Sequence, residues 1–157
     1  MIFNIIKNSR FKLKKNKKKN ISKNKFEEYK SEFKNFYDEA NSKLQQFNLN
    51  DWKVTFDYAK RRAGACIYSK KELSFSIYFL RNSSSFDLND TLLHEISHAL
   101  VGPNQGHNNI WRKKALSIGC TGKVYHSLNF SNPGWIKYCS NFCWEQKCYR
   151  RKQKLIC

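Results

Sequence analysis

The segment Thr91 to Leu100 is the feature that most constrains this chain, because it carries His94, Glu95 and His98 at helical spacing. Residues four apart share one face of a helix, so both imidazoles can reach a single metal ion while Glu95 lies beside it. Two imidazoles and a third protein ligand leave one tetrahedral position of Zn²⁺ to water, whose pKa falls to about 7. Glu95 could then take a proton from that water. The spacing also arises by chance, but the chain has only four histidines, so the pattern favours a hydrolytic zinc site.

The flanking residues predict the helix independently of the motif. Asp87 is expected as its N-cap with Asp90 at the third helical position, and Gly102-Pro103 is expected to end it in a left-handed cap. An apolar stripe runs between these ends and consists of Leu88, Leu92, Ile96 and Leu100. These signals place the motif on a helix whose apolar stripe packs on the rest of the protein.

Few residues after Glu95 could supply a third zinc ligand. The later candidates are His107, His126 and the carboxylate of Glu145. His107 is favoured because it follows a turn-rich segment, 102–106, and precedes a second predicted helix from Asn108 to Ile118. His126 remains an alternative, although its segment has no comparable signal.

The positive charge of the chain is concentrated at its two ends. The 157 residues have a net charge of +18; residues 1–25 hold ten Lys and Arg and no acid, and residues 135–157 hold six against Glu145. Basic chain ends usually contact a polyanion, most often nucleic acid and sometimes anionic lipid. The alternative is a solvated tail enriched in Lys by codon bias. We expect nucleic acid to be the partner of both ends.

The composition also indicates an intracellular protein without a membrane span. The apolar run of residues 1–6 is too short for a span or a signal-peptide core, and no later run approaches eighteen apolar residues. Without an export signal, the six cysteines are expected to be thiols or metal ligands rather than disulfides. Lys14 to Lys19 could act as a nuclear address or contact phosphates. Residues 1–25 are expected to form a disordered basic arm.

Periodicity predicts an α+β fold that forms one domain. We expect the protein to be a monomer. Aromatic and aliphatic residues recur at helical spacing from Phe26 to Phe47, which predicts one long amphipathic helix. Three runs then alternate as strands do, at 52–58, 63–68 and 73–79, and predict a three-stranded antiparallel meander. Within the second run, Gly64 is expected to mark a bulge or a close approach. The metal helix and a following helix come next, and a short Cys-rich tail ends the chain.

Several separated blocks resemble the SprT-like zinc proteins, the group that includes Spartan-type metalloproteases. They are Arg61-Arg-Ala-Gly-Ala-Cys66, the third strand, His94 to Leu100, Gly106-His107 with Trp111, and Ile118-Gly119. The resemblance covers about residues 30–157 and implies a zincin fold with a metalloprotease domain over 26–134. It implies that His94, His98 and His107 bind the catalytic zinc and that Glu95 is the base. The implied substrate is protein held on DNA, with cleavage of DNA-protein crosslinks as the role of the Spartan branch.

Further expectations concern the substrate and the competing functions. The third strand is expected to be the sheet edge beside the cleft and to bind the substrate backbone by strand addition. One alternative is a nucleic-acid-binding zinc protein without proteolytic activity. A zinc amidase or peptidase for small or cell-wall substrates is another, which the basic ends and the lack of an export signal disfavour.

The basic tail, 135–157, resembles part of the zinc ribbon that ends many SprT-like proteins. The resemblance suggests a structural Cys₄ zinc site of Cys139, Cys143, Cys148 and Cys157. The first pair departs from the ribbon pattern, since three residues rather than two separate Cys139 from Cys143. The alternative is a ribbon that has lost its metal and still presents basic residues to phosphate, with aromatics that suit stacking on unpaired bases.

Overall fold

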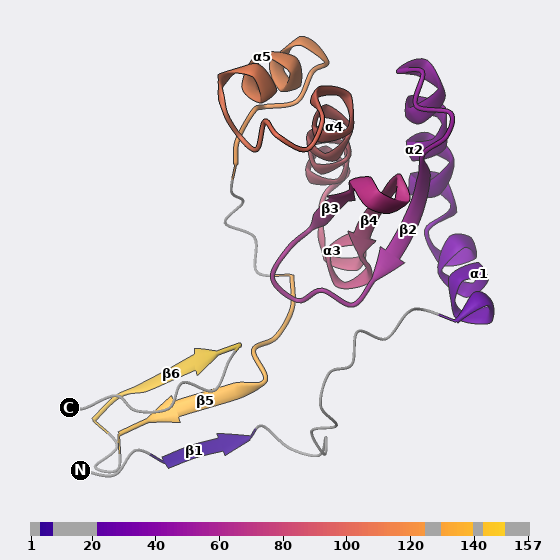
Figure 1. Cartoon of the computed structure of the whole chain (residues 1–157). Helices are drawn as coiled ribbons and strands as arrows, with labels where there is room; N and C mark the ends of the chain where they lie inside the picture. The colour runs from indigo at the N-terminus through magenta and orange to yellow at the C-terminus, as the bar shows by residue number, and fades with distance from the viewer. Residues whose placement is uncertain (1–3, 8–21, 125–129, 140–142, 150–157) are drawn as a thin grey trace. The chain divides into compact units, whose positions relative to one another are not determined.

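The computed structural model describes residues 4–7, 22–124, 130–139 and 143–149, which fall into two compact units. One unit consists of residues 20–131 and the other of residues 1–19 together with 132–157. Among the described residues, the first unit contains five α-helices and one sheet, and the second contains a separate sheet (Figure 1). The mixed α+β class predicted from the sequence is confirmed.

The prediction of one long helix over residues 26–47 is wrong, because two helices occupy this segment. α1 (Lys23–Glu32) and α2 (Lys34–Gln46) meet at Phe33, whose φ of −108° and ψ of 33° leave helical geometry. The break lets side chains from both helices surround Phe56 of the sheet. Its ring centroid lies 5.6 Å from that of Phe26, 5.8 Å from Phe33 and 6.2 Å from Tyr37.

The prediction of an antiparallel meander is also wrong, since the last of the three strands lies between the first two. The sheet contains β2 (Lys53–Asp57), β3 (Gly64–Ile67) and β4 (Glu72–Ser76) in the order β2-β4-β3. β4 pairs parallel to β2 and antiparallel to β3. Four successive residues of β4, from Leu73 to Ser76, are buried, as expected of a central strand with both faces covered, whereas β3 is half-buried throughout. β3 is therefore an edge strand.

The third predicted strand ends earlier than its alternation suggests. A 3-10 turn, η1 (Tyr68–Lys70), joins β3 to β4, and α3 (Ile77–Asn82) follows β4 directly. Ser76 caps α3 through its hydroxyl, which accepts a hydrogen bond from the backbone N–H of Phe79. Ile77 and Phe79 are therefore core residues of a helix rather than of a strand.

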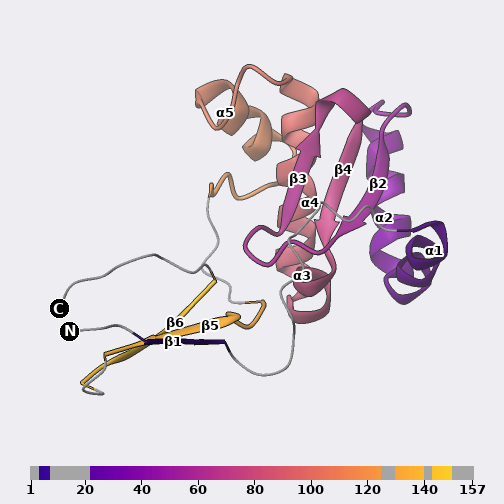
Figure 2. The ribbon, with the colours of Figure 1, turned by 60° about the horizontal axis from the view of Figure 1, so that its bottom comes forward.

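The metal-motif helix is α4 (Ser85–Val101), and it begins three residues earlier than predicted. Its N-cap is Ser84 rather than Asp87, because the Ser84 hydroxyl accepts from the backbone N–H of Asp87. The helix ends at Gly102, which has a positive φ of 86°. α2 packs on β2 and α4 on β3, so both helices cover the same face of the sheet (Figure 2). α5 (Asn109–Ser117) packs on α4 and is capped by Asn108, close to the predicted boundary.

The second unit is a three-stranded antiparallel sheet. It contains β1 (Asn4–Lys7), β5 (Trp135–Tyr138) and β6 (Glu145–Cys148) in the order β1-β5-β6. Composition predicts disorder over residues 1–25, whereas residues 4–7 form a strand and α1 begins at Lys23; residues 8–21 lie outside the described part. The boundary between the units falls at 131/132, three residues before the predicted limit of the catalytic domain.

None of the helices in the described ranges combines the length and the apolar character that crossing a bilayer requires.

Candidate metal centre

Three imidazoles converge on one point of the first unit. His94 and His98 project from α4, and His107 lies in the loop before α5. Nε2 of His107 is 3.0 Å from Nε2 of His94 and 3.0 Å from Nε2 of His98. Ring nitrogens bound to one tetrahedral zinc at about 2.05 Å would lie about 3.3 Å apart. Within the described part of the chain this is the one group of three or more ligand side chains close enough to hold a metal ion.

A single buried tryptophan from α5 supports all three rings. Trp111 is fully buried, and its ring centroid lies 4.7 Å from that of His94, 5.2 Å from His98 and 4.6 Å from His107. The Asn108 side chain accepts hydrogen bonds from the backbone N–H groups of Ile110 and Trp111. The cap therefore starts α5 directly after His107 and sets the position of Trp111 under the site.

The surroundings of His98 and His107 favour the neutral form that metal binding needs. Burial, together with the neighbouring His94 and His107, lowers the pKa of His98 to about 4. Burial also lowers the pKa of His107 below its ordinary value. Neutral imidazole is the form that binds a metal, so protons do not compete for His98 near neutral pH. The residues present fit a zinc ion.

Tyr68 ties the end of the metal helix to the edge strand. Its hydroxyl donates to the carbonyl oxygens of His98, at 3.0 Å, and Gly102, at 3.1 Å. Burial raises the pKa of Tyr68, so the phenol remains a donor. The His98 carbonyl also accepts a hydrogen bond from the backbone N–H of Gly102, at 3.0 Å, so Tyr68 adds a second donor to this end of the helix. The backbone that carries His98 is thereby held against the segment that follows β3.

Glu95 is buried between α4 and the edge strand. Its side chain lies so close to Gly64 that a β-carbon there would be 2.8 Å from both Cγ and Oε1 of Glu95. The Cys66 backbone N–H also donates a hydrogen bond to this carboxyl group. The close approach predicted for Gly64 is confirmed, and its partner is the carboxylate of the motif.

The ladder geometry shows which side of β3 Glu95 occupies. The Ser76 backbone N–H donates to the Ala63 carbonyl at 2.8 Å, so the backbone groups of Ala63 point toward β4. Orientation alternates along a strand, and the N–H and C=O groups of Gly64 and Cys66 therefore point away from β4. Glu95 lies at this outer edge of the sheet.

Burial dominates the ionisation of Glu95. It raises the pKa of Glu95 to about 7, although the Arg62 guanidinium and the Cys66 N–H oppose the shift. Arg62 is held in place by an ion pair with Asp57, whose carboxylate lies 2.8 Å away. A carboxyl group with a pKa near neutrality is suited to accept a proton and to return it.

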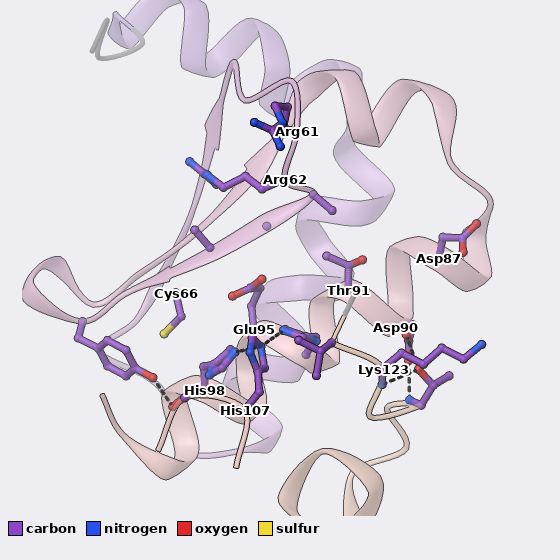
Figure 3. A pocket seen from close by; sticks show the side chains of 18 of the residues that line it. Arg61, Arg62, Cys66, Asp87, Asp90, Thr91, Glu95, His98, His107 and Lys123 are labelled. Carbon is purple, nitrogen blue, oxygen red and sulfur yellow. Dashed lines mark hydrogen bonds between the residues drawn. The ribbon is translucent and has the colours of Figure 1, made fainter. Parts of the chain in front are cut away.

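The imidazoles and Glu95 face a cleft of about 780 Å³ (Figure 3). One wall is β3 from Gly64 to Cys66, and the other is the face of α4 that carries His94 and His98. Phe86 lines it near the start of α4 and Pro103 beyond the end of α4, while Lys123 and Val124 come from the segment after α5. The edge strand beside the cleft is therefore β3, and the assignment of this place to the third strand is wrong.

The remaining predicted ligands are His126 and the cysteines of the tail. His126 and Cys157 lie outside the described residues. Cys139 and Cys143 lie in the turn between β5 and β6, whereas Cys148 pairs in register with Trp135 at the other end of these strands. The three intervening residue steps of β5 correspond to about 10 Å. The Cys₄ site stays a prediction, and the described cysteines do not form a metal-binding group.

Sequence reasoning missed the supporting roles of Trp111 and Tyr68. Trp111 follows His107 by four residues, so the signal was an aromatic side chain one helical turn beyond a candidate ligand. Tyr68 carried no local signal, because its partners are backbone carbonyls more than 25 residues away.

A helix with two imidazoles and a carboxylate, a third imidazole from the next loop and an adjacent edge strand define a metallopeptidase-type fold. The model of the SprT-like family matches residues 26–131, which is two thirds of the chain. The chain therefore belongs to the SprT-like family. A comparison with curated proteins gives no match.

Replacing Gly64 by alanine should disturb Glu95 specifically. The new β-carbon would force the buried carboxylate away from the strand, and we expect a loss of about 1–3 kcal/mol in the free energy of unfolding. Gly134→Ala is the matched control, since a β-carbon there has no neighbour within 4 Å. Urea unfolding of both variants measures the difference. Equal stabilities would contradict the tight contact.

Replacing Glu95 by glutamine should change how the stability of the metal-free protein depends on pH. Between pH 4.5, the ordinary pKa, and about 7 the folded state retains a proton that the unfolded chain releases, so wild-type stability falls as pH rises. Glutamine cannot titrate, and the variant should gain about 3 kcal/mol relative to wild type between pH 4.5 and 8. Urea unfolding in the presence of a chelator measures this gain. If the difference in unfolding free energy between variant and wild type did not change with pH, burial would not raise the pKa of Glu95.

Proposed function

We propose that this protein is a zinc-dependent endopeptidase that cleaves proteins held on DNA. The observation that carries the proposal is the convergence of three imidazoles beside a buried carboxyl group and the outer edge of β3. A purely structural metal site would not require a buried carboxyl group of raised pKa at its side.

His94, His98 and His107 are the residues that would hold the zinc, and they leave one tetrahedral position open. Bound there, zinc lowers the pKa of water and polarises a carbonyl group. Glu95 accepts the proton of the attacking water and returns it to the nitrogen of the leaving amine. The ordinary form of Glu95 near neutral pH is a mixture of carboxylate and acid, which suits both steps.

The edge strand supplies the binding site for the polypeptide. The outward backbone groups of Gly64 and the outward carbonyl of Cys66 can pair with an extended substrate, which then runs along the cleft past Glu95. Such pairing requires the substrate to be unfolded or extended locally. It reads the main chain and therefore gives weak sequence preference.

Selectivity must then come from co-localisation with the substrate. A protease bound to the same DNA as its target encounters it at a raised effective concentration. The excess of Lys and Arg at the chain ends supports DNA as the shared scaffold. Cleavage of crosslinked proteins is the corresponding biological role.

Glu95→Gln should abolish cleavage and leave zinc in place. Loss of the general base should reduce the rate by about 10²–10⁴-fold, since glutamine cannot accept the proton. The assay follows cleavage of a DNA-bound protein with and without DNA, and wild-type cleavage should rise when DNA is present. Glu39→Gln on the exposed face of α2 removes the same charge and serves as control. Zinc binding without cleavage by the wild type would favour the non-proteolytic nucleic-acid-binding protein instead.

His107→Ala should remove the metal, and His126→Ala should not. Loss of a partner that only orients a ligand costs about 10–100-fold in metal affinity, so loss of a direct ligand should cost more. Mass spectrometry under native conditions counts the zinc in each variant, and competition with a chelator measures affinity. Retention of zinc by His107→Ala with loss in His126→Ala would reverse the assignment of the third ligand.

A further inference from the structure

The cleft beside the imidazoles contains a large apolar side chain that is exposed to solvent. Phe86, in the first turn of α4, keeps 67% of its surface accessible. The other exposed large apolar residues in the described part of the chain do not line the cleft; they are Tyr58, Ile110 and Leu116. A single exposed aromatic ring is ordinary on a protein surface. This one borders the path proposed for the substrate.

The first turn of α4 holds Phe86 in this position. The Ser84 hydroxyl accepts a hydrogen bond from the Asp87 backbone N–H at 3.2 Å and donates one to the Asp87 carboxylate at 2.6 Å. This cap fixes the turn that carries Phe86. Leu88, two residues further on, packs against the core. Residues two apart on a helix point to different sides, so Phe86 is directed away from the core.

Phe86 lies at a defined distance from the metal ligands along α4. Phe86, Asp90 and His94 follow each other at intervals of four residues, and all three line the cleft. The eight residue steps from Phe86 to His94 span about 12 Å of helix, which corresponds to three or four residues of an extended chain. A substrate whose scissile carbonyl lies at the imidazoles would therefore bring to Phe86 a residue three or four positions from that bond.

The direction of β3 indicates on which side of the scissile bond this residue lies. Gly64, at the start of β3, lies against Glu95. Tyr68, after β3, donates to the carbonyl oxygen of Gly102 at the end of α4. β3 and α4 therefore run in the same direction. Antiparallel pairing is slightly more stable per residue than parallel pairing, so a substrate that adds to β3 runs toward the start of α4. The residue that reaches Phe86 then follows the scissile bond.

The segment after α5 forms a fixed wall on this side of the metal centre. One carboxylate oxygen of Asp90 accepts a hydrogen bond from the Thr121 backbone N–H at 2.6 Å, and the other accepts from the Thr121 hydroxyl at 2.8 Å (Figure 3). Thr121 and Val124 of this segment line the cleft. Asp90 is one helical turn from Phe86 and one from His94. The cleft between them is therefore bordered by a segment that is held against α4.

We propose that Phe86 forms a subsite for a large apolar side chain of the substrate, three or four residues after the scissile bond. The inference rests on the proposed peptidase function and adds one side-chain preference to the main-chain pairing along β3. Contact between two apolar side chains removes both from water, which favours binding. Folded proteins bury most of their large apolar side chains. A polypeptide would therefore offer an extended backbone and an accessible apolar side chain together only where it is unfolded.

The test measures cleavage of peptides by the full-length zinc-loaded protein, with the same DNA in every reaction. In a peptide series of constant length and charge, leucine or serine occupies each position in turn on both sides of one cleavable bond. Mass spectrometry identifies the bond that is cut. The variants are Phe86→Ala, the conservative Phe86→Leu, and Leu116→Ala, which shortens an exposed apolar side chain outside the cleft.

The quantity compared is the ratio of kcat/KM for the leucine peptide to that for the serine peptide. Wild type should prefer leucine about tenfold at the third or fourth position after the bond. Phe86→Ala should abolish this preference, whereas Phe86→Leu and Leu116→Ala should retain it. Loss of stability or of zinc would lower kcat/KM for both peptides together, so a change in their ratio reports the subsite.

A leucine preference that persists in Phe86→Ala, or no preference at these positions in wild type, would overturn the subsite. A preference that depends on Phe86 but lies before the scissile bond would overturn its placement. Failure of wild type to cleave any peptide would overturn the proposed function instead. Binding of the same peptides, labelled with a fluorophore, then still tests the subsite: tighter binding of leucine peptides that is lost in Phe86→Ala supports it, and equal affinities overturn it.

Discussion

The contact between Glu95 and Gly64 is the constraint on which the unit of residues 20–131 depends. It places the carboxyl group of α4 directly on the outer edge of β3, at a distance that only a residue without a β-carbon permits. The same contact removes the carboxyl group from water and so raises its pKa to about 7. Tyr68 fixes the relation of strand and helix one turn further along by its bonds to His98 and Gly102. The carboxyl group, two of the three imidazoles and the exposed edge of the sheet are thereby set by one helix–strand interface.

The third imidazole, that of His107, is positioned by other contacts. His107 lies outside any helix, and its position follows from the Asn108 cap and from Trp111, which packs under all three imidazoles. The fully buried ring gives the ligands a rigid apolar support and limits water on that side of the centre. Preorganised ligands lose little freedom when they bind a metal, which favours a stable site. These contacts fix the position of His107 although it lies in a loop.

The candidate site was predictable because its signals are local, whereas the errors in the fold concern partners distant in sequence. The spacing of His94 and His98 and the turn before His107 are readable from adjacent residues. The pairing of β4 between β2 and β3 depends on which strands become neighbours, and alternation along a strand carries no such information. The break at Phe33 was hidden because the aromatic residues on both sides keep helical spacing while they pack around Phe56. β1 was missed because four residues in a lysine-rich segment give a weak signal, and their partner is more than 125 residues away.

The distribution of charge suggests a division of roles under the proposed function. In the cleft, the positive charges of Arg61, Arg62 and Lys123 are partly offset by Asp87, Asp90 and the ionised fraction of Glu95, so the cleft carries much less positive charge than the unit of residues 1–19 and 132–157, which has fourteen Lys and Arg against Glu145 alone. Nucleic acid is instead attracted to the unit with a net charge of +13. A cleft that attracted DNA would be occupied by the scaffold rather than by the protein attached to it. Separating the charge from the catalytic centre leaves the outer edge of β3 available to a polypeptide, so that binding to DNA promotes cleavage without competing for the same surface.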